Sequence, residues 1–108
     1  MRNDEHDLTD QQMVAASFIA VSEVSGKVLR EKLTEAGFRK DGPRFYVFMG
    51  RLERDGLVDG RYVKVQGNTR QLRERHYKLT ATGRRALDRK IALMELAKNQ
   101  MQLGFGYA

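Results

Sequence analysis

The chain has 108 residues, of which 41% are hydrophobic, and this combination fits one domain with a single modest core. It contains no cysteine, which excludes disulfides and thiolate chemistry, and no apolar run near the roughly 20 residues that cross a membrane, so we expect a cytoplasmic protein. The net charge is +6, and residues 26–90 hold eighteen Lys or Arg against eight Asp or Glu, which suggests a polyanionic partner, although basic surfaces also meet membranes and acidic proteins.

The N-terminal stretch is polar and acidic, without the apolar core of a signal peptide, and residues 1–8 are predicted to be a flexible tail. Thr9 begins the pattern Thr-Asp-Gln-Gln, in which the side chains of Thr9 and Gln12 would each accept a backbone N–H of the other, as in a capping box. A first helix should therefore run from about Asp10 to Ser22. Its apolar residues lie on more than one face, which indicates deep burial or sharing with another subunit.

A second helix is predicted from Gly26 to about Ala36, with Ser25 as its N-cap and an apolar stripe that includes Leu29 and Leu33. Gly37 is placed to adopt the left-handed conformation that ends a helix. A short basic turn then leads to the next helix.

The third helix is predicted from Pro43 to Asp55, and Gly56 should end it. The apolar residues at i, i+3, i+4 and i+7 form its core face: Phe45, Phe48, Met49 and Leu52, with Tyr46 at the edge. The opposite face carries Arg44, Val47, Arg51 and Arg54. Such a helix can enter a DNA major groove, where arginine reaches guanine or phosphate. The alternative is a solvated face whose arginines pair with Glu53 and Asp55.

Two antiparallel strands are predicted, over Leu57–Val65 and over His76–Leu79, with a turn at Gly67-Asn68. Positive charge is concentrated at the tip and on its return, at Arg70, Arg73 and Arg75. In a winged helix this tip contacts phosphates or an adjacent groove, whereas the alternative is a basic loop that touches nothing.

The last helix should begin after Thr80 or Thr82 and continue to about Leu103, which is long for so small a domain. One stripe of the helix is apolar: Leu87, Ile91, Met94 and Met101. Because the domain is too small to cover the second half of this stripe, we expect it to form a subunit interface. Residues 104–108 are predicted to be a second flexible tail.

These elements together predict a mainly α fold with a small β-ribbon: a winged helix-turn-helix domain at residues 9–80, followed by a dimerisation helix at residues 81–103. The predicted DNA contacts are Lys40, Arg44, Tyr46, Val47, Arg51, Arg54, Arg70, Arg73 and Arg75. The predicted homodimer interface consists of Val14, Phe18, Ile19, Leu87, Ile91, Met94 and Met101. A possible pocket for a small aromatic effector at this interface would be lined by Phe18, Met94 and Met101.

Two motifs resemble those of the PadR family of bacterial winged-helix transcriptional regulators: Tyr46-x-x-Met-x-x-Leu-Glu-x-x-Gly-Leu-Val58 and Tyr77-x-Leu-Thr-x-x-Gly-Arg-Arg-Ala-Leu87. The Leu-Thr-x-x-Gly segment is also similar to the MarR family. The PadR resemblance, over about residues 10–103, implies a homodimeric repressor that binds operator DNA and that a small phenolic or drug-like ligand can release. The second helix departs from the family pattern, because it reads Ser-Gly-Lys-Val where a Gly-Tyr-Glu-Ile type of signature is common.

An enzyme is not expected, because the sequence has no cysteine, no paired histidines and no Gly-x-Ser-x-Gly nucleophile motif. We therefore predict no metal, no other cofactor and no membrane partner. The competing hypothesis is a winged-helix module that binds proteins without specific DNA binding. A protein-binding module has no need of positive charge on both the third helix and the wing, so retention on heparin or nonspecific duplex DNA at low salt would distinguish the two.

Overall fold

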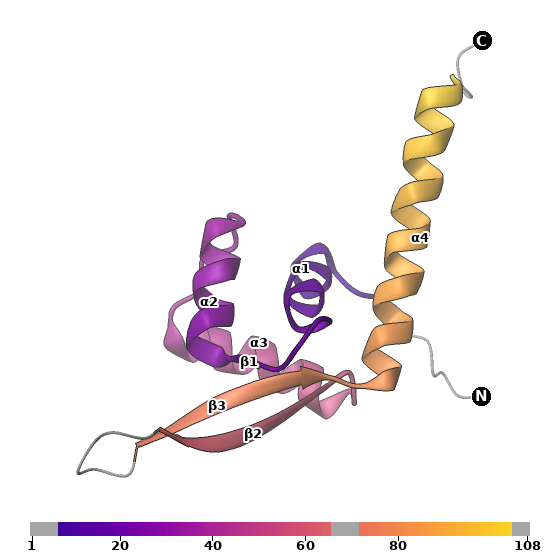
Figure 1. The fold of residues 1–108 in the computed structure, drawn as a ribbon. Helices are drawn as coiled ribbons and strands as arrows, with labels where there is room; N and C mark the ends of the chain where they lie inside the picture. Colours follow the sequence, from indigo (N-terminus) through magenta and orange to yellow (C-terminus); the bar gives the residue numbers. More distant parts are fainter. Residues whose placement is uncertain (1–6, 66–71, 105–108) are drawn as a thin grey trace.

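The computed structural model describes residues 7–65 and 72–104 (Figure 1). Its elements follow in the order α1 (Asp10–Ile19), β1 (Val24–Ser25), α2 (Gly26–Glu35), α3 (Gly42–Arg54), β2 (Val58–Val65), β3 (Leu72–Leu79) and α4 (Ala81–Leu103). Helices α1 to α3 lie together, the β2–β3 ribbon extends away from them, and α4 rises from the end of β3 as a single long helix (Figure 1). The predicted fold class, a mainly helical winged helix-turn-helix with a small ribbon and a long final helix, is confirmed.

Helix starts follow the predicted caps. The Gln12 backbone N–H donates to Oγ1 of Thr9 at 3.1 Å, and the Thr9 N–H donates to the Gln12 side chain at 2.9 Å, which completes the capping box. Ser25 caps α2 and Thr80 caps α4 in the same way, each by accepting one backbone N–H. Helix α3 begins one residue earlier than predicted, because Asp41 is its N-cap.

Helix ends follow the predicted glycines. Gly37 has a φ of 95°, and the following Phe38 N–H donates to the Leu33 carbonyl at 2.8 Å, which is the Schellman geometry. Gly56 ends α3 with a φ of 75°. Helix α1, by contrast, ends at Ile19 rather than near Ser22, because the chain must turn there to reach the sheet.

The sheet is antiparallel in the order β1-β3-β2. Strand β1, which the sequence did not predict, is two residues long and pairs Val24 with Tyr77. Strand β3 begins at Leu72, earlier than the predicted His76, because it pairs with β2 along its whole length, from Val65 opposite Leu72 onward. The predicted turn and Arg70 lie outside the described residues.

The core lies where α1, α2, α3 and the start of α4 meet the base of the sheet. Its buried apolar residues are Leu8, Ala15, Ala16, Ile19, Leu29, Leu33, Phe45, Met49, Leu52, Leu57, Val58, Tyr77, Ala86 and Leu87. Three of these correct the sequence-based expectations. Leu8 packs into the core although it was placed in a flexible tail, and Ile19 and Leu87 are covered by their own chain, so they are not available to the predicted subunit interface.

Helix α4 is packed only at its beginning. Ion pairs join Lys90 to Asp10 at 3.2 Å and Arg89 to Asp7 at 2.8 Å, which ties this first part of α4 to the α1 region. Every residue from Ile91 to Gly104 is exposed. Within the described ranges, no helix combines the length and the apolar character that crossing a bilayer would need.

Candidate nucleic-acid interface

The outer face of α3 is basic and exposed. The helix is anchored by buried Phe45, Met49 and Leu52 on its inner face. This anchoring turns the opposite side to solvent, where four of the predicted DNA contacts lie: Arg44, Val47, Arg51 and Arg54. Tyr46, predicted at the edge of the core face, is 60% exposed.

The arginines of this face are only loosely paired. Arg44 lies 3.8 Å from the Asp41 carboxylate, and Arg54 lies 3.8 Å from that of Asp55. Exposed pairs of this kind contribute about 0–1 kcal/mol, so a phosphate or a base edge could replace them at little cost. Glu53, the other carboxylate considered as a partner for these arginines, turns instead toward the wing.

Lys40 lies at the edge of this face. Its ammonium donates to the Gln11 side chain at 2.6 Å and sits 4.6 Å from the centre of the Phe48 ring. A hollow of about 380 Å³ lies beside it, and its lining consists of Lys40, Pro43, Arg44, Val47, Phe48 and Arg51. The hollow therefore combines an apolar floor with a cationic rim.

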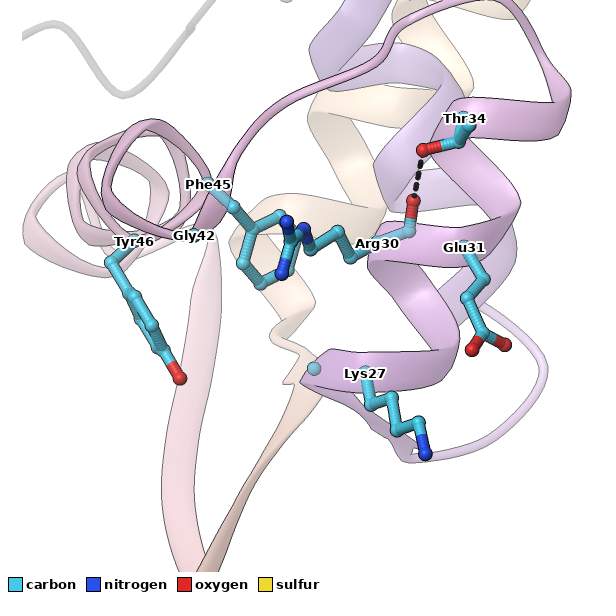
Figure 2. A pocket seen from close by; sticks show the side chains of 8 residues that line it. Lys27, Arg30, Glu31, Thr34, Gly42, Phe45 and Tyr46 are labelled. Carbon is cyan, nitrogen blue, oxygen red and sulfur yellow. Dashed lines mark hydrogen bonds between the residues drawn. The ribbon is translucent and has the colours of Figure 1, made fainter.

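A second hollow of about 340 Å³ separates α2 from the start of α3 (Figure 2). Arg30 reaches across it from α2 toward α3 (Figure 2). Its Nε donates to the Lys40 carbonyl at 2.9 Å. Lys27 and Tyr46, one from each helix, extend to the same side of this hollow (Figure 2). Sequence reasoning had not placed Lys27 or Arg30 at the site, although their three-residue spacing at the start of α2 was a usable signal.

Arg75 is paired within the fold. It was expected to contact DNA, but its guanidinium donates to the Glu53 carboxylate of α3, and both side chains are about three-quarters covered. The guanidinium also lies over the Tyr62 ring, 4.7 Å from its centre. Burial opposes the charge of Arg75, but the bond to Glu53 and its negative charge outweigh this effect, and the pKa of Arg75 is raised.

Gly60 makes room for this pair. A Cβ at Gly60 would lie 2.7 Å from both the Arg75 guanidinium and the Glu53 carboxylate. The glycine in β2 therefore lets the two side chains meet across the sheet. We call the three residues Glu53, Gly60 and Arg75 the wing brace, because they connect α3 to the strands of the wing.

A second polar cluster connects the wing to the segment before β1. Glu23 accepts two hydrogen bonds from Arg61, at 3.0 and 2.9 Å, and lies 3.2 Å from Nδ1 of His76. The hydrogen bond from Arg61 outweighs partial desolvation and lowers the pKa of Glu23. Nearby, burial and the charge of Glu53 raise the pKa of Tyr77 to about 12. The other ring nitrogen of His76, Nε2, lies 3.2 Å from the Glu74 carboxylate on the same strand, so His76 sits between two carboxylates.

Removing either charged member of the wing brace should destabilise the fold. We expect Glu53→Ala and Arg75→Ala each to lower the free energy of unfolding by about 1.5–3 kcal/mol, because each leaves a largely covered charge without its partner. The double variant should lose clearly less than the sum of the two, since the interaction can be lost only once. Urea unfolding followed by circular dichroism measures all three.

Arg73→Ala, on the same strand but exposed, is the control and should change stability by less than about 0.5 kcal/mol. Additive losses would show that Glu53 and Arg75 are not coupled.

The architecture matches solved structures. A PadR family transcription regulator from hypervirulent Clostridium difficile R20291 aligns with a TM-score of 0.73 and 19% identity, over 91% of this chain and 100% of that one. A PadR family transcriptional regulator from Eggerthella lenta DSM 2243 aligns with a TM-score of 0.66 and 21% identity, over 90% and 82% of the two chains. The chain has the PadR winged-helix fold.

A third structure with the PadR fold contains bound DNA. It is Bacillus subtilis PadR in complex with operator DNA, which aligns with a TM-score of 0.64 and 20% identity, over 76% of this chain and 46% of that one. No family model matches the sequence, and a comparison with curated proteins found no match. At these identities the structural alignments establish the fold and do not assign the residues of the site.

Proposed function

We propose that the chain is a sequence-specific DNA-binding transcriptional regulator, a dimeric repressor of the PadR type that acts in the cytoplasm. The observation that carries this proposal is the exposed arginine face of α3, in a fold shared with a regulator solved on its operator DNA. A helix whose inner face is anchored and whose outer face is basic fits the dimensions and the charge of a major groove.

The exposed cations divide into two groups in this proposal. Arg44 and Arg51 lie on the outer face of α3, where a recognition helix meets base edges. Arg73 is exposed on β3, in the wing, where contacts to phosphate would dominate. Arg70 is close to it in sequence but lies outside the described residues. Lys40 and Arg54 extend the positive surface at the two ends of the helix. We leave Arg75 out of this set, because its guanidinium is bound to Glu53.

Dimer formation would use the free part of α4. Ile91 and Met94 are 43% and 48% exposed in the single chain, and Met101 is more exposed still. Val14 and Phe18 of α1 are partly buried at the edge of the core, and they could receive α4 of a partner. A two-fold dimer would bind two half-sites about one helical turn apart. An effector site at this interface, lined by Phe18, Met94 and Met101, is part of the same proposal.

The two groups of arginines should respond differently to substitution. Arg51→Ala should weaken operator binding by about 1–3 kcal/mol and leave binding to random DNA nearly unchanged, because a base contact is lost. Arg73→Ala should weaken both and reduce the salt dependence by about one unit of slope, because a phosphate contact is lost. Fluorescence anisotropy on a footprinted site and on a scrambled duplex, at several salt concentrations, measures both effects.

Arg73→Lys serves as the matched control, since it keeps the positive charge at the same position of β3 and a phosphate contact depends on that charge. It should not reproduce the parallel loss seen for Arg73→Ala. Equal losses on both duplexes for Arg51→Ala would remove α3 from the role of sequence reader. A wild type with no preference for the footprinted site would contradict the proposed function itself.

A further inference from the structure

Val47 is an apolar residue placed at the centre of a basic helix face. It is 57% exposed, although valine is a weaker helix former than most residues that occupy exposed helix positions. Arg44 precedes it by three residues and Arg51 follows it by four, so both lie beside it on the helix surface. A solvated helix face would be expected to carry a polar residue at this position.

Val47 lines a hollow that has both apolar and cationic side chains. Val47, Pro43 and Phe48 form the apolar part of the 380 Å³ hollow, and Lys40, Arg44 and Arg51 provide its cationic side chains. An occupant must therefore offer an apolar group close to negative charge or to hydrogen-bond acceptors. The edge of a base pair in duplex DNA has this combination, since the thymine 5-methyl group is the one apolar group that the major groove presents and guanine and phosphate acceptors surround it.

We propose that Val47, on the floor formed with Pro43, is a specificity-determining residue that reads a thymine methyl group in each half-site. The inference rests on the proposed function, and it adds the base that this part of α3 recognises. Arg44 and Arg51 lie on either side of the methyl subsite, where they would reach acceptors at neighbouring positions of the same groove. Gly50, which has nothing within 4 Å of where its Cβ would stand, leaves the adjoining helix surface open to the duplex.

The test removes one methyl group at a time. Duplexes that the wild type selects from a random pool are resynthesised with single deoxyuridines in place of thymines, and binding is measured by anisotropy. We expect one thymine per half-site at which the substitution weakens binding about 3- to 5-fold, the loss that corresponds to one buried methyl group. Other thymines should tolerate the change.

Protein variants test whether Val47 is the residue that contacts the thymine methyl group. Val47→Ala should lose most of the deoxyuridine penalty, because it removes the two methyl groups of valine that would contact the thymine methyl. Val28→Ala makes the same substitution at another exposed helix position, on α2, and should keep the full deoxyuridine penalty. Arg51→Ala should bind more weakly overall and also keep the penalty.

The outcomes separate this inference from the proposed function. If the wild type selects a defined site but Val47→Ala retains the deoxyuridine penalty, or if no thymine is sensitive, the methyl subsite is wrong while DNA recognition stands. If the wild type selects no site from the pool, the proposed function fails and the methyl subsite fails with it.

Discussion

Replacing Gly83 with alanine should lower the free energy of unfolding by about 3 kcal/mol or more, at the upper end for overpacked sites. A Cβ at this position would lie 2.0 Å from the backbone carbonyl oxygen of Leu57, far inside van der Waals contact. That oxygen cannot move aside easily, because it accepts the Thr80 N–H at 3.1 Å. Gly83 itself donates its N–H to the capping hydroxyl of Thr80. Hydrogen bonds at Thr80 and Gly83 therefore both fix the position of the first turn of α4.

The measurement is urea unfolding monitored by circular dichroism, with Gly50→Ala as the control. Gly50 is also inside a helix, but nothing lies within 4 Å of its missing Cβ. Its replacement should therefore leave stability unchanged or raise it by up to about 1 kcal/mol, the helix propensity difference between the two residues. A Gly83→Ala protein as stable as the wild type would show that α4 does not approach the Leu57 carbonyl as closely as the structure indicates.

The paired substitution Ile91→Asp and Met94→Asp should convert a dimer into folded monomers. Complete burial of such side chains is worth about 1.5–3 kcal/mol each, and roughly half of this remains available, since they are about half exposed in one chain. Over two subunits the loss is about 3–6 kcal/mol, which weakens association by about two to four orders of magnitude. Because neither residue belongs to the buried core, the thermal transition of the monomer should remain cooperative.

Light scattering at tens of micromolar protein measures the assembly state, and circular dichroism checks the fold. Ala92→Asp with Asn99→Asp is the control, since it adds the same charge on the other side of α4 and should leave the dimer intact. A wild type that is monomeric at this concentration would remove the dimer from the proposal. A paired variant that remains dimeric would move the interface away from Ile91 and Met94.

Features governed by neighbouring residues could be predicted from the sequence. The capping box at Thr9 and the left-handed glycines at Gly37 and Gly56 depend on residues within one helical turn. The outward placement of Arg51 and Val47 follows from the 3.6-residue period once the apolar face of α3 is recognised. The fold class and most of the exposed cations of the candidate site were predictable for this reason.

Features that depend on residues distant in sequence could not be predicted. Strand β1 is too short to show a period, and it exists because β3 offers it a free edge. Nothing in the sequence distinguishes Arg75 from the other wing arginines. In the fold it binds Glu53, which is 22 residues away in sequence, in the space that Gly60 leaves open.

The sequence by itself determined the caps at Thr9 and Ser25, the glycines that end α2 and α3, and which face of α3 is basic, because these properties are set by local hydrogen bonds and by periodicity. Only the tertiary structure decided which of the predicted interface and DNA-binding residues are already buried or paired within the chain. The apolar pattern of the sequence predicted Ile19 and Leu87 at the subunit interface. Packing within one chain buries both residues and leaves Ile91 and Met94 uncovered. An apolar stripe specifies that a surface must be covered, whereas the path of the chain decides whether its own core or a second molecule covers it.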